Sequence, residues 1–332
     1  ILNGEFEQMA LKQKMRHTTH ALHAALPGAY EEVLPVLLAV APNYTGFDGM
    51  VFSDYVGCYG LHDWERSLPA LREMTRGISA EFAIRHFLRD DPARALPTFY
   101  QWALDPDPAV RRLASEGSRP RLPWGIGLPA FKNDPTPILP ILEQLKDDPS
   151  EDVRRSVANN LNDIAKDNPE VVLEIAERWL GQSEEVDRVV KHACRTLLKA
   201  GDLRAMRLFG FAEPTDVRIR NLVCEPPRPS IGEDIVFRYE LLLETAEPLL
   251  LRLEYAIVFA RSRGKTSRKV FHHREGEFAP GSHTIRKKHS FRDLSTRKHY
   301  PGEQQIEIIV NGALKECVSV WLENPPADKS PG

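Results

Sequence analysis

The sequence predicts a multidomain protein in which an all-α solenoid of HEAT-like repeats is followed by an all-β sandwich of the immunoglobulin type. Two observations support this prediction. A helical pattern that begins near Val110 recurs near Val153 and Val189, at a period close to 40 residues, with an Asp-Pro turn ahead of the helix. From Arg218 onward, apolar residues alternate with polar ones, as in strands. The predicted boundaries are helical repeats over 1–212, a linker over 213–221, a sandwich over 222–325 and a tail over 326–332.

The composition is that of an ordinary globular protein. The 332 residues are 42% hydrophobic and 27% charged, and they suffice for two domains. A net charge of −3 excludes a polycation, so any nucleic-acid surface must be local. We find no long apolar run and no signal-peptide pattern, and expect a soluble, cytoplasmic protein. The four cysteines have no metal-binding spacing, so we expect free thiols, no metal and no cofactor.

Segments with helical spacing of apolar residues cover much of the chain up to Phe211, where the helical array is expected to end. They are residues 5–26, 31–40, 68–75, 80–89, 93–104, 136–145 and 170–180. An aromatic patch lies among them, at Tyr44, Phe47, Phe52, Tyr55, Tyr59 and Trp64. Aromatic residues at irregular spacing usually fill a core, and this is the favoured interpretation. A stacking platform for bases is the alternative.

The first copy of the repeated helix has an apolar face opposite a charged one. Val110 and Ala114 share one face, whereas Arg112, Glu116 and Arg119 share the other. A carboxylate between two guanidiniums has two interpretations. It belongs to a solvated face with weak intrahelical ion pairs, or it is a negative charge held inside a positive groove.

The later copies keep this division between faces. In the second copy the apolar stripe is Val153, Val157, Leu161 and Ile164, and the opposite stripe is Arg155, Asn159, Asn162 and Lys166. In the third, weaker copy the polar stripe is Lys191 and Arg195. Superposing the copies places Glu116, Asn159 and Arg195 at one equivalent position. The stacked stripes then form a basic, amide-rich surface with one acid in it, which favours the positive groove.

A loop rich in proline and glycine follows Arg119, because Pro120 and Pro123 do not allow the helix to continue. It carries Arg121 and Trp124. The tryptophan either lies beside a ligand or closes the end of the repeat, and the sequence does not decide between these.

The C-terminal part reads as short strands at residues 235–243, 249–259, 282–291, 304–310 and 315–322. Asn311-Gly312 between the last two is a strong signal of a type I′ hairpin. About seven strands of this length fit an immunoglobulin-like sandwich.

One stretch of this sandwich is strongly basic. Residues 252–298 contain 13 Lys and Arg against 4 Asp and Glu. Its expected tip contains Arg261, Arg263, Lys265, Arg268 and Lys269. A solubilising loop is one explanation. Because the rest of the chain is acidic, a phosphate-contacting patch is favoured.

These residues carry a family resemblance. The helical part resembles the HEAT-like-repeat alkylpurine DNA glycosylases, and its fusion to a sandwich narrows the resemblance to the AlkC branch. The match rests on ASEGSRPRLPW at 114–124 and VRRSVANNLNDI at 153–164, of which the first run is the more specific. It extends over nearly the whole chain.

The resemblance implies a monofunctional glycosylase that hydrolyses the N-glycosidic bond of cationic N-alkylated bases, such as 3-methyladenine and 3-methylcytosine, without full extrusion of the base. It implies double-stranded DNA as the partner, and we expect a monomer. A cationic base is a good leaving group, and its departure builds an oxocarbenium-like sugar. A carboxylate aimed at that sugar would stabilise it and orient water, and no general acid is needed.

Residue roles follow from the resemblance together with the stripes. Glu116 is the expected stabilising carboxylate, and Trp124 would pack against the deoxyribose or the lesion. Glu151 is a second carboxylate candidate, although an acid at a helix N-terminus usually serves the helix dipole. Asn159 and Asn162 would face the groove, and Asn160 would be a buried amide that bridges repeats. The expected phosphate contacts are Arg112, Arg119, Arg121, Arg154, Arg155, Lys166, Lys191 and Arg195 in the helices, with the basic tip in the sandwich.

A protein of another class remains as the alternative: a non-catalytic HEAT-repeat scaffold that binds DNA structures or proteins. The isolated acid on a basic stripe argues for catalysis, because a surface that only binds phosphate gains nothing from it.

Overall fold

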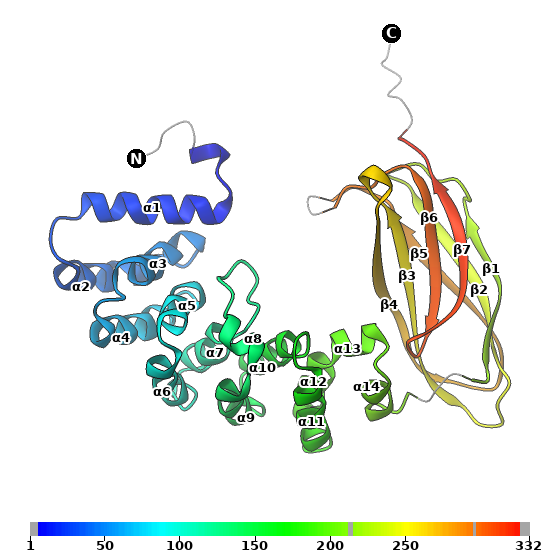
Figure 1. The fold of residues 1–332 in the computed structure, drawn as a ribbon, viewed down its shortest axis with the longest axis horizontal. Coiled ribbons are helices and arrows are strands. Elements are labelled where there is room, and N and C mark those ends of the chain that lie inside the picture. Colours follow the sequence, from blue (N-terminus) through cyan, green and yellow to red (C-terminus); the bar gives the residue numbers. More distant parts are fainter. Residues whose placement is uncertain (1–5, 212–214, 295–296, 326–332) are drawn as a thin grey trace, which may run out of the picture. The chain divides into compact units, whose positions relative to one another are not determined.

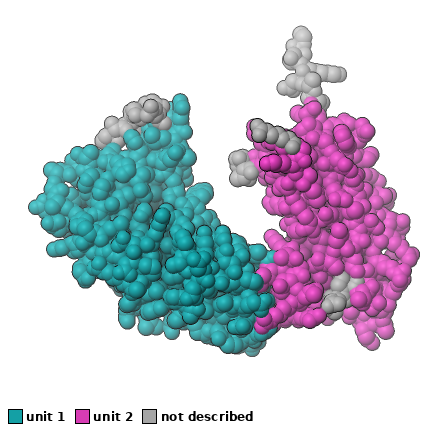
Figure 2. All heavy atoms as spheres, viewed as in Figure 1, with its two compact units in different colours: residues 1–196 teal, residues 197–332 magenta. Residues whose placement is uncertain are grey.

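The computed structural model describes residues 6–211, 215–294 and 297–325, with the side chain of Arg263 excepted. The chain divides into two compact units, residues 1–196 and 197–332, which Figure 2 draws in teal and magenta. Within the described residues, no helix is both long and apolar enough to cross a membrane.

Unit 1 is built from two rows of helices (Figure 1). The inner row consists of α1, α3, α5, α7, α10 and α12, each of which packs on the next; α2, α4, α6, α9 and α11 flank it. The bounds of the inner row are α1 (Leu11–Ala25), α3 (Met50–Tyr59), α5 (Glu81–Asp90), α7 (Pro108–Gly117), α10 (Glu151–Ile164) and α12 (Glu184–Ala193). The others are α2 (Tyr30–Val40), α4 (Trp64–Met74), α6 (Pro92–Trp102), α8 (Pro129–Asn133), α9 (Leu139–Leu145) and α11 (Pro169–Trp179). The predicted repeat solenoid is confirmed.

The sequence of α7 explains where this helix begins and what it buries. Asp107 caps the helix by accepting from the backbone N–H of Ala109 at 2.9 Å, and Pro108 follows at the first turn. Val110 is fully buried. In α10, the predicted stripe from Val153 to Ile164 is at most 1% exposed. Burial of each such aliphatic side chain contributes about 1.5–3 kcal/mol, so the apolar stripes fix which face of each inner helix points outward.

Arginine–aspartate pairs join successive repeats. Arg72 donates to Asp105 at 2.6 Å, and Arg111 donates to Asp148, also at 2.6 Å. The two aspartates belong to the predicted Asp-Pro turns. Arg154 occupies the position of Arg111 in the next copy and donates to the Asp148 carbonyl. Its guanidinium makes no ion pair with any described residue. Asp148 lies three residues before α10, whereas Gly181, which has no carboxylate, lies three residues before α12.

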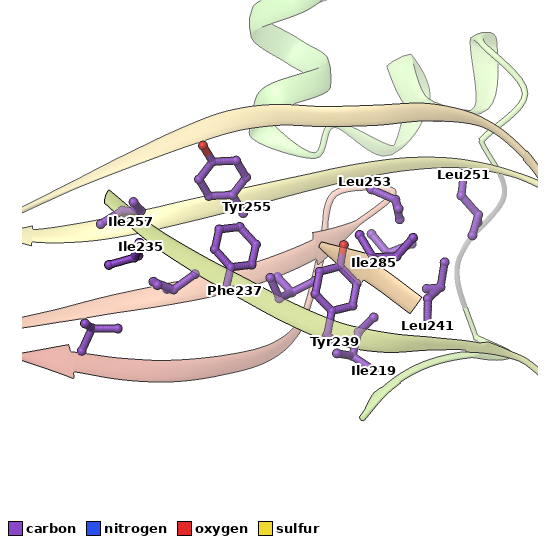
Figure 3. Close-up of a cluster of buried hydrophobic side chains, with 14 of the residues drawn as sticks. Ile219, Ile235, Phe237, Tyr239, Leu241, Leu251, Leu253, Tyr255, Ile257 and Ile285 are labelled. Carbon is purple, nitrogen blue, oxygen red and sulfur yellow. The ribbon is translucent and has the colours of Figure 1, made fainter. Parts of the chain in front are cut away.

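Unit 2 contains the predicted sandwich. Its strands are β1 (Val217–Glu225), β2 (Asp234–Leu243), β3 (Leu249–Ala260), β4 (Thr266–Phe278), β5 (Gly281–Ser290), β6 (Gly302–Val310) and β7 (Ala313–Leu322). They form two antiparallel sheets, β1-β2-β5 and β4-β3-β6-β7. Alternate residues of β2 and β3, among them Phe237, Tyr239 and Tyr255, point into a shared core (Figure 3). The predicted immunoglobulin-like architecture is confirmed.

Some predicted boundaries differ from the observed ones. Strand β1 starts at Val217, inside the predicted linker, because buried Val217 and Ile219 already alternate there with exposed arginines. Strand β4 includes Arg268 and Lys269, which were expected in a loop tip. The aromatic patch is mainly core, as favoured, with Tyr55 at 1% exposure, although Tyr44 is 41% exposed. No disulfide joins the cysteines of the described residues.

Two short helices, α13 (Arg195–Ala200) and α14 (Leu203–Leu208), precede the sandwich. Helix α14 and most of α13 belong to unit 2. Gly201 in the turn between them meets Gly312 of the β6–β7 hairpin: a Cβ on Gly312 would lie 2.5 Å from Gly201 Cα. Asn311 and Gly312 both have positive φ, 44° and 79°, as a type I′ turn requires. Only glycine permits this approach of two backbones.

Candidate functional site

Glu116 lies in the last turn of α7, in the inner row, and is 5% exposed. Its Oε1 accepts a hydrogen bond from Arg119 Nη1 at 2.6 Å, and Arg112 Nη2 is 3.8 Å from the same oxygen. Its Oε2 accepts from Ser156 Oγ at 2.6 Å. The structure therefore brings together the acid and the two guanidiniums that the sequence placed on one face.

A serine pair joins α7 to α10 beside this carboxylate. Ser156 Oγ is 2.6 Å from Glu116 and 2.9 Å from Ser115 Oγ, and a hydroxyl has one hydrogen. Because an ionised carboxylate only accepts, Ser156 donates to Glu116 and accepts from Ser115. Asn160 Nδ2 donates to the Ser115 carbonyl at 2.8 Å, which confirms the predicted bridging amide. Sequence reasoning missed Ser156, because the equivalent position of the first copy is Leu113 and no serine recurs there.

Two of the residues that were expected in the groove are buried. Arg119 is 6% exposed and also donates from Nε to Asp163 Oδ2 at 2.9 Å. Burial opposes its charge, but the carboxylates of Glu116 and Asp163 outweigh burial and raise the pKa of Arg119. Asn162 is 2% exposed and accepts from the Thr196 hydroxyl at 2.8 Å. The side chains of Arg119 and Asn162, expected to contact phosphate and to face the groove, are therefore buried against partners within the protein.

Trp124 has the opposite surroundings. It lies in the loop after α7 and is 70% exposed. Its φ of 63° is rare outside glycine. Its carbonyl accepts from Lys12 Nζ at 2.7 Å. No described residue hydrogen-bonds to its indole N–H or stacks on its ring. The interpretation as a plug for the end of the repeat is not supported by this exposure.

Glu151 is the first residue of α10 and lies in an open pocket of about 270 Å³. Its side chain is 77% exposed and pairs with Arg155 at 3.1 Å. The pocket is also lined by Arg154, Glu185, Arg188 and His192. Arg188 pairs with Glu185 at 3.1 Å. Burial, with nearby arginines, lowers the pKa of His192.

The remaining expected phosphate contacts of unit 1 have partners of varied kinds. Arg112 pairs with Glu81 at 3.1 Å, and Lys166 with Asp163 at 3.0 Å. Arg121 donates from Nε and Nη2 to the two carboxylate oxygens of Asp167. Lys191 is exposed. Arg195 Nη2 donates to Asn159 Oδ1 at 3.0 Å, so these two equivalent positions do meet. In the described part of the chain, no three His, Cys, Asp or Glu side chains come together as a metal site.

The basic tip of the sandwich is only partly loop. Arg261 is half-buried, and Lys265 and Lys269 are exposed. Arg268 pairs with Glu307 at 2.8 Å. The side chain of Arg263 lies outside the described structure.

Comparisons with known proteins cover both units. A family model described as "HEAT repeat" matches residues 138–167, and one described as "Uncharacterised protein YhaZ, C-terminal Ig-like domain" matches residues 218–324. The chain is 42% identical over 315 residues to the Bacillus subtilis (strain 168) protein "Uncharacterized protein YhaZ", across 95% of this chain and 88% of that protein. The Pseudomonas fluorescens alkylpurine DNA glycosylase AlkC, solved bound to DNA containing an abasic site analog, superposes with a TM-score of 0.91 at 39% identity. That match covers 96% of this chain and 89% of the other.

Proposed function

Because the chain belongs to the AlkC branch of the HEAT-like-repeat alkylpurine DNA glycosylases, we propose that it is a DNA repair glycosylase. It hydrolyses the N-glycosidic bond of cationic N-alkylated bases in double-stranded DNA, with 3-methyladenine and 3-methylcytosine as the expected substrates. The observation that supports this most is the Glu116 carboxylate, held in the inner row by Arg119 and Ser156.

The proposed chemistry needs one fixed anion. As the cationic base departs, positive charge develops on the deoxyribose, and a carboxylate that is already oriented stabilises it without reorganisation. Each carboxylate oxygen has two lone-pair sites. Oε1 and Oε2 of Glu116 therefore keep acceptor capacity for a water molecule after binding Arg119 and Ser156. That water would attack the sugar, and the lesion need not leave the duplex completely.

Two further residues complete the proposed site. Trp124 would pack its exposed indole on the deoxyribose or the lesion. Glu151 would be a second carboxylate in its pocket, although its place in the first turn of α10 also fits a role at the helix dipole.

The DNA backbone would be contacted by cations of both units, by a single copy of the chain. The proposed contacts are Arg112, Arg121, Arg154, Arg155, Lys166, Lys191 and Arg195, with Arg261, Arg263, Lys265, Arg268 and Lys269 of the sandwich. Cations now paired with acids would exchange those partners for phosphate, since exposed ion pairs are worth about 1 kcal/mol or less.

The test is base release. DNA treated with a methylating agent is incubated with the purified protein, and the free bases are identified by mass spectrometry, with untreated DNA as the control. We expect 3-methyladenine and 3-methylcytosine to be released and the strands to stay intact until alkali cleaves the abasic sites. Absence of released base at enzyme excess would refute the proposal.

One observation favours the alternative of a non-catalytic scaffold. Both oxygens of Glu116 already have internal partners, as in a purely structural joint between α7 and α10. A scaffold would bind branched or damaged DNA in the same experiment and release no base.

A further inference from the structure

The loop after α7 is fixed from beneath by a buried arginine. Arg85 of α5 is fully buried, and its Nε donates to the Ile126 carbonyl at 2.7 Å. Its Nη1 donates to the carbonyls of Gly117 and Arg119, at 2.9 and 2.6 Å. No carboxylate of the described residues pairs with it. One guanidinium thus binds both ends of the segment that carries Trp124.

The sides of the same loop are also anchored. Leu122 and Leu128 are 5% and 2% exposed, so both flanks of the tip are buried. The backbone N–H of Leu128 donates to the Pro120 carbonyl at 3.2 Å and closes the loop. A Cβ on Gly125 would lie 3.0–3.1 Å from Leu122 and Arg85. The backbone around Trp124 therefore has little room to move.

A lysine from the far end of the inner row holds the tip itself. Lys12 of α1 donates from Nζ to the Trp124 carbonyl at 2.7 Å, across 112 positions of sequence. The same nitrogen lies 4.0 Å from the ring centroid of Phe82 on α5, a cation–π contact. Burial, the largest influence, lowers the pKa of Lys12.

The hydrogen bonds from Arg85 and Lys12 all go to backbone carbonyls of this segment, and none goes to the indole of Trp124. A tryptophan with φ of 63° and 70% exposure is unfavourable in two ways, through backbone strain and through exposed apolar area. Folding alone does not require either. A rigid support that presents an unpartnered aromatic ring is suited to a planar partner outside the protein.

We propose that Lys12 is a positioning residue for Trp124. By holding the Trp124 carbonyl, it fixes the direction in which the indole projects from the inner row, as a stacking surface for a nucleobase or deoxyribose at the lesion. This inference rests on the proposed function, and it assigns Lys12 to the tryptophan rather than to a DNA phosphate.

A double-mutant cycle separates these two roles. The variants are Lys12→Met, which removes the donor but keeps the aliphatic chain over Phe82, Trp124→Ala, and the double mutant. Lys14→Met is the matched control, because Lys14 lies on the same helix with its Nζ 5.4 Å from the ring of Phe6. Lys12→Arg, which keeps a donor, tests rescue. Single-turnover release of 3-methyladenine and the salt dependence of DNA binding are measured for each.

We expect Trp124→Ala to slow base release by about 10- to 100-fold, the range for loss of one base–aromatic stack. Lys12→Met is expected to slow it by about 3- to 10-fold, in proportion to a lost charge-assisted hydrogen bond that is partly replaced by water. In the Trp124→Ala background, Lys12→Met should have no further effect. Lys14→Met should stay within about twofold of the wild type, and Lys12→Arg should recover most of the rate.

Several outcomes would overturn the inference. A Lys12→Met rate equal to that of Lys14→Met, or effects that multiply in the double mutant, would mean that Lys12 does not act through Trp124. Normal activity of Trp124→Ala would remove the tryptophan from the reaction and the inference with it, while the glycosylase proposal would stand.

An inactive wild-type protein would refute the proposed function, but it would not refute the role of Lys12 in holding the Trp124 carbonyl. Chymotryptic cleavage after Trp124 tests whether Lys12 holds this loop, and it does not depend on glycosylase activity. We expect the bond to be cut faster in Lys12→Met than in Lys14→Met, and equal rates would overturn the inference.

Discussion

Replacement of Glu116 by glutamine tests the proposed chemistry most directly. The substitution keeps the shape and one acceptor oxygen but removes the charge beside Arg119 and Ser156. Loss of a carboxylate aimed at a developing cation is expected to lower the rate of base release by about 10²- to 10³-fold, by analogy with the removal of one electrostatic stabiliser elsewhere.

The same substitution has a price in stability that can be bounded from the contacts. Breaking a buried ion pair by removing one partner typically costs about 3–5 kcal/mol. Here Arg119 keeps its second carboxylate, Asp163, at 2.9 Å, so its charge stays compensated. We therefore expect Glu116→Gln to destabilise unit 1 by about 2 kcal/mol, the value of one charge-assisted hydrogen bond.

The assay combines three measurements on Glu116→Gln and on Glu151→Gln, which removes the charge of the other, exposed carboxylate of the proposed site. They are single-turnover base release, affinity for lesion DNA, and urea unfolding. For Glu116→Gln we expect lost release, DNA affinity within about twofold of the wild type, and the stability loss given above. For Glu151→Gln the stability change should be below about 1 kcal/mol, as for exposed ion pairs. Full activity of a folded Glu116→Gln protein would refute the proposed role of Glu116 in catalysis. The residue would then only connect α7 to α10.

Three other predictions concern unit 2. Burial, with repulsion from His299 and Arg297, lowers the pKa of His289 to about 4. The unfolded chain therefore binds a proton that the folded one does not between about pH 6.5 and pH 4. The wild type should lose about 2 kcal/mol more than His289→Gln between pH 7 and pH 5 in urea unfolding; parallel losses would contradict this. Lys269→Gln should lower the slope of log affinity against log salt by about 1, if Lys269 contacts one phosphate. Gly312→Ala should lower the midpoint of urea unfolding by far more than Gly264→Ala. Both have positive φ, but only at position 312 would a Cβ meet backbone; equal shifts would exclude the steric explanation.

Features set by local sequence were predictable. The stripe from Val153 to Ile164 is buried because helical spacing alone places those residues on one face. The turn at Asn311 has the expected positive φ because few residues tolerate that conformation. The position of Glu116 between Arg112 and Arg119 followed from the same helical geometry.

Features set by contacts between repeats were not predictable from one stretch at a time. Helical geometry could not tell that Arg119 would meet Asp163, 44 positions away, and become buried. It could not find Ser156 or Arg85 either, because both residues act through partners on other helices. The charged face expected to line a groove is in part an interface between inner helices. The sequence period indicated which helices would be neighbours, but not which side chains would meet between them.

The glycine contact at residues 201 and 312 bears on how this protein can be dissected. The turn between α13 and α14 packs against the β6–β7 hairpin, so this turn is structurally part of the sandwich unit. A fragment that starts at the first strand would uncover that hairpin, whereas one that starts at residue 197 keeps it covered. Separate study of the two units should divide the chain inside α13, well before the place where the helices end.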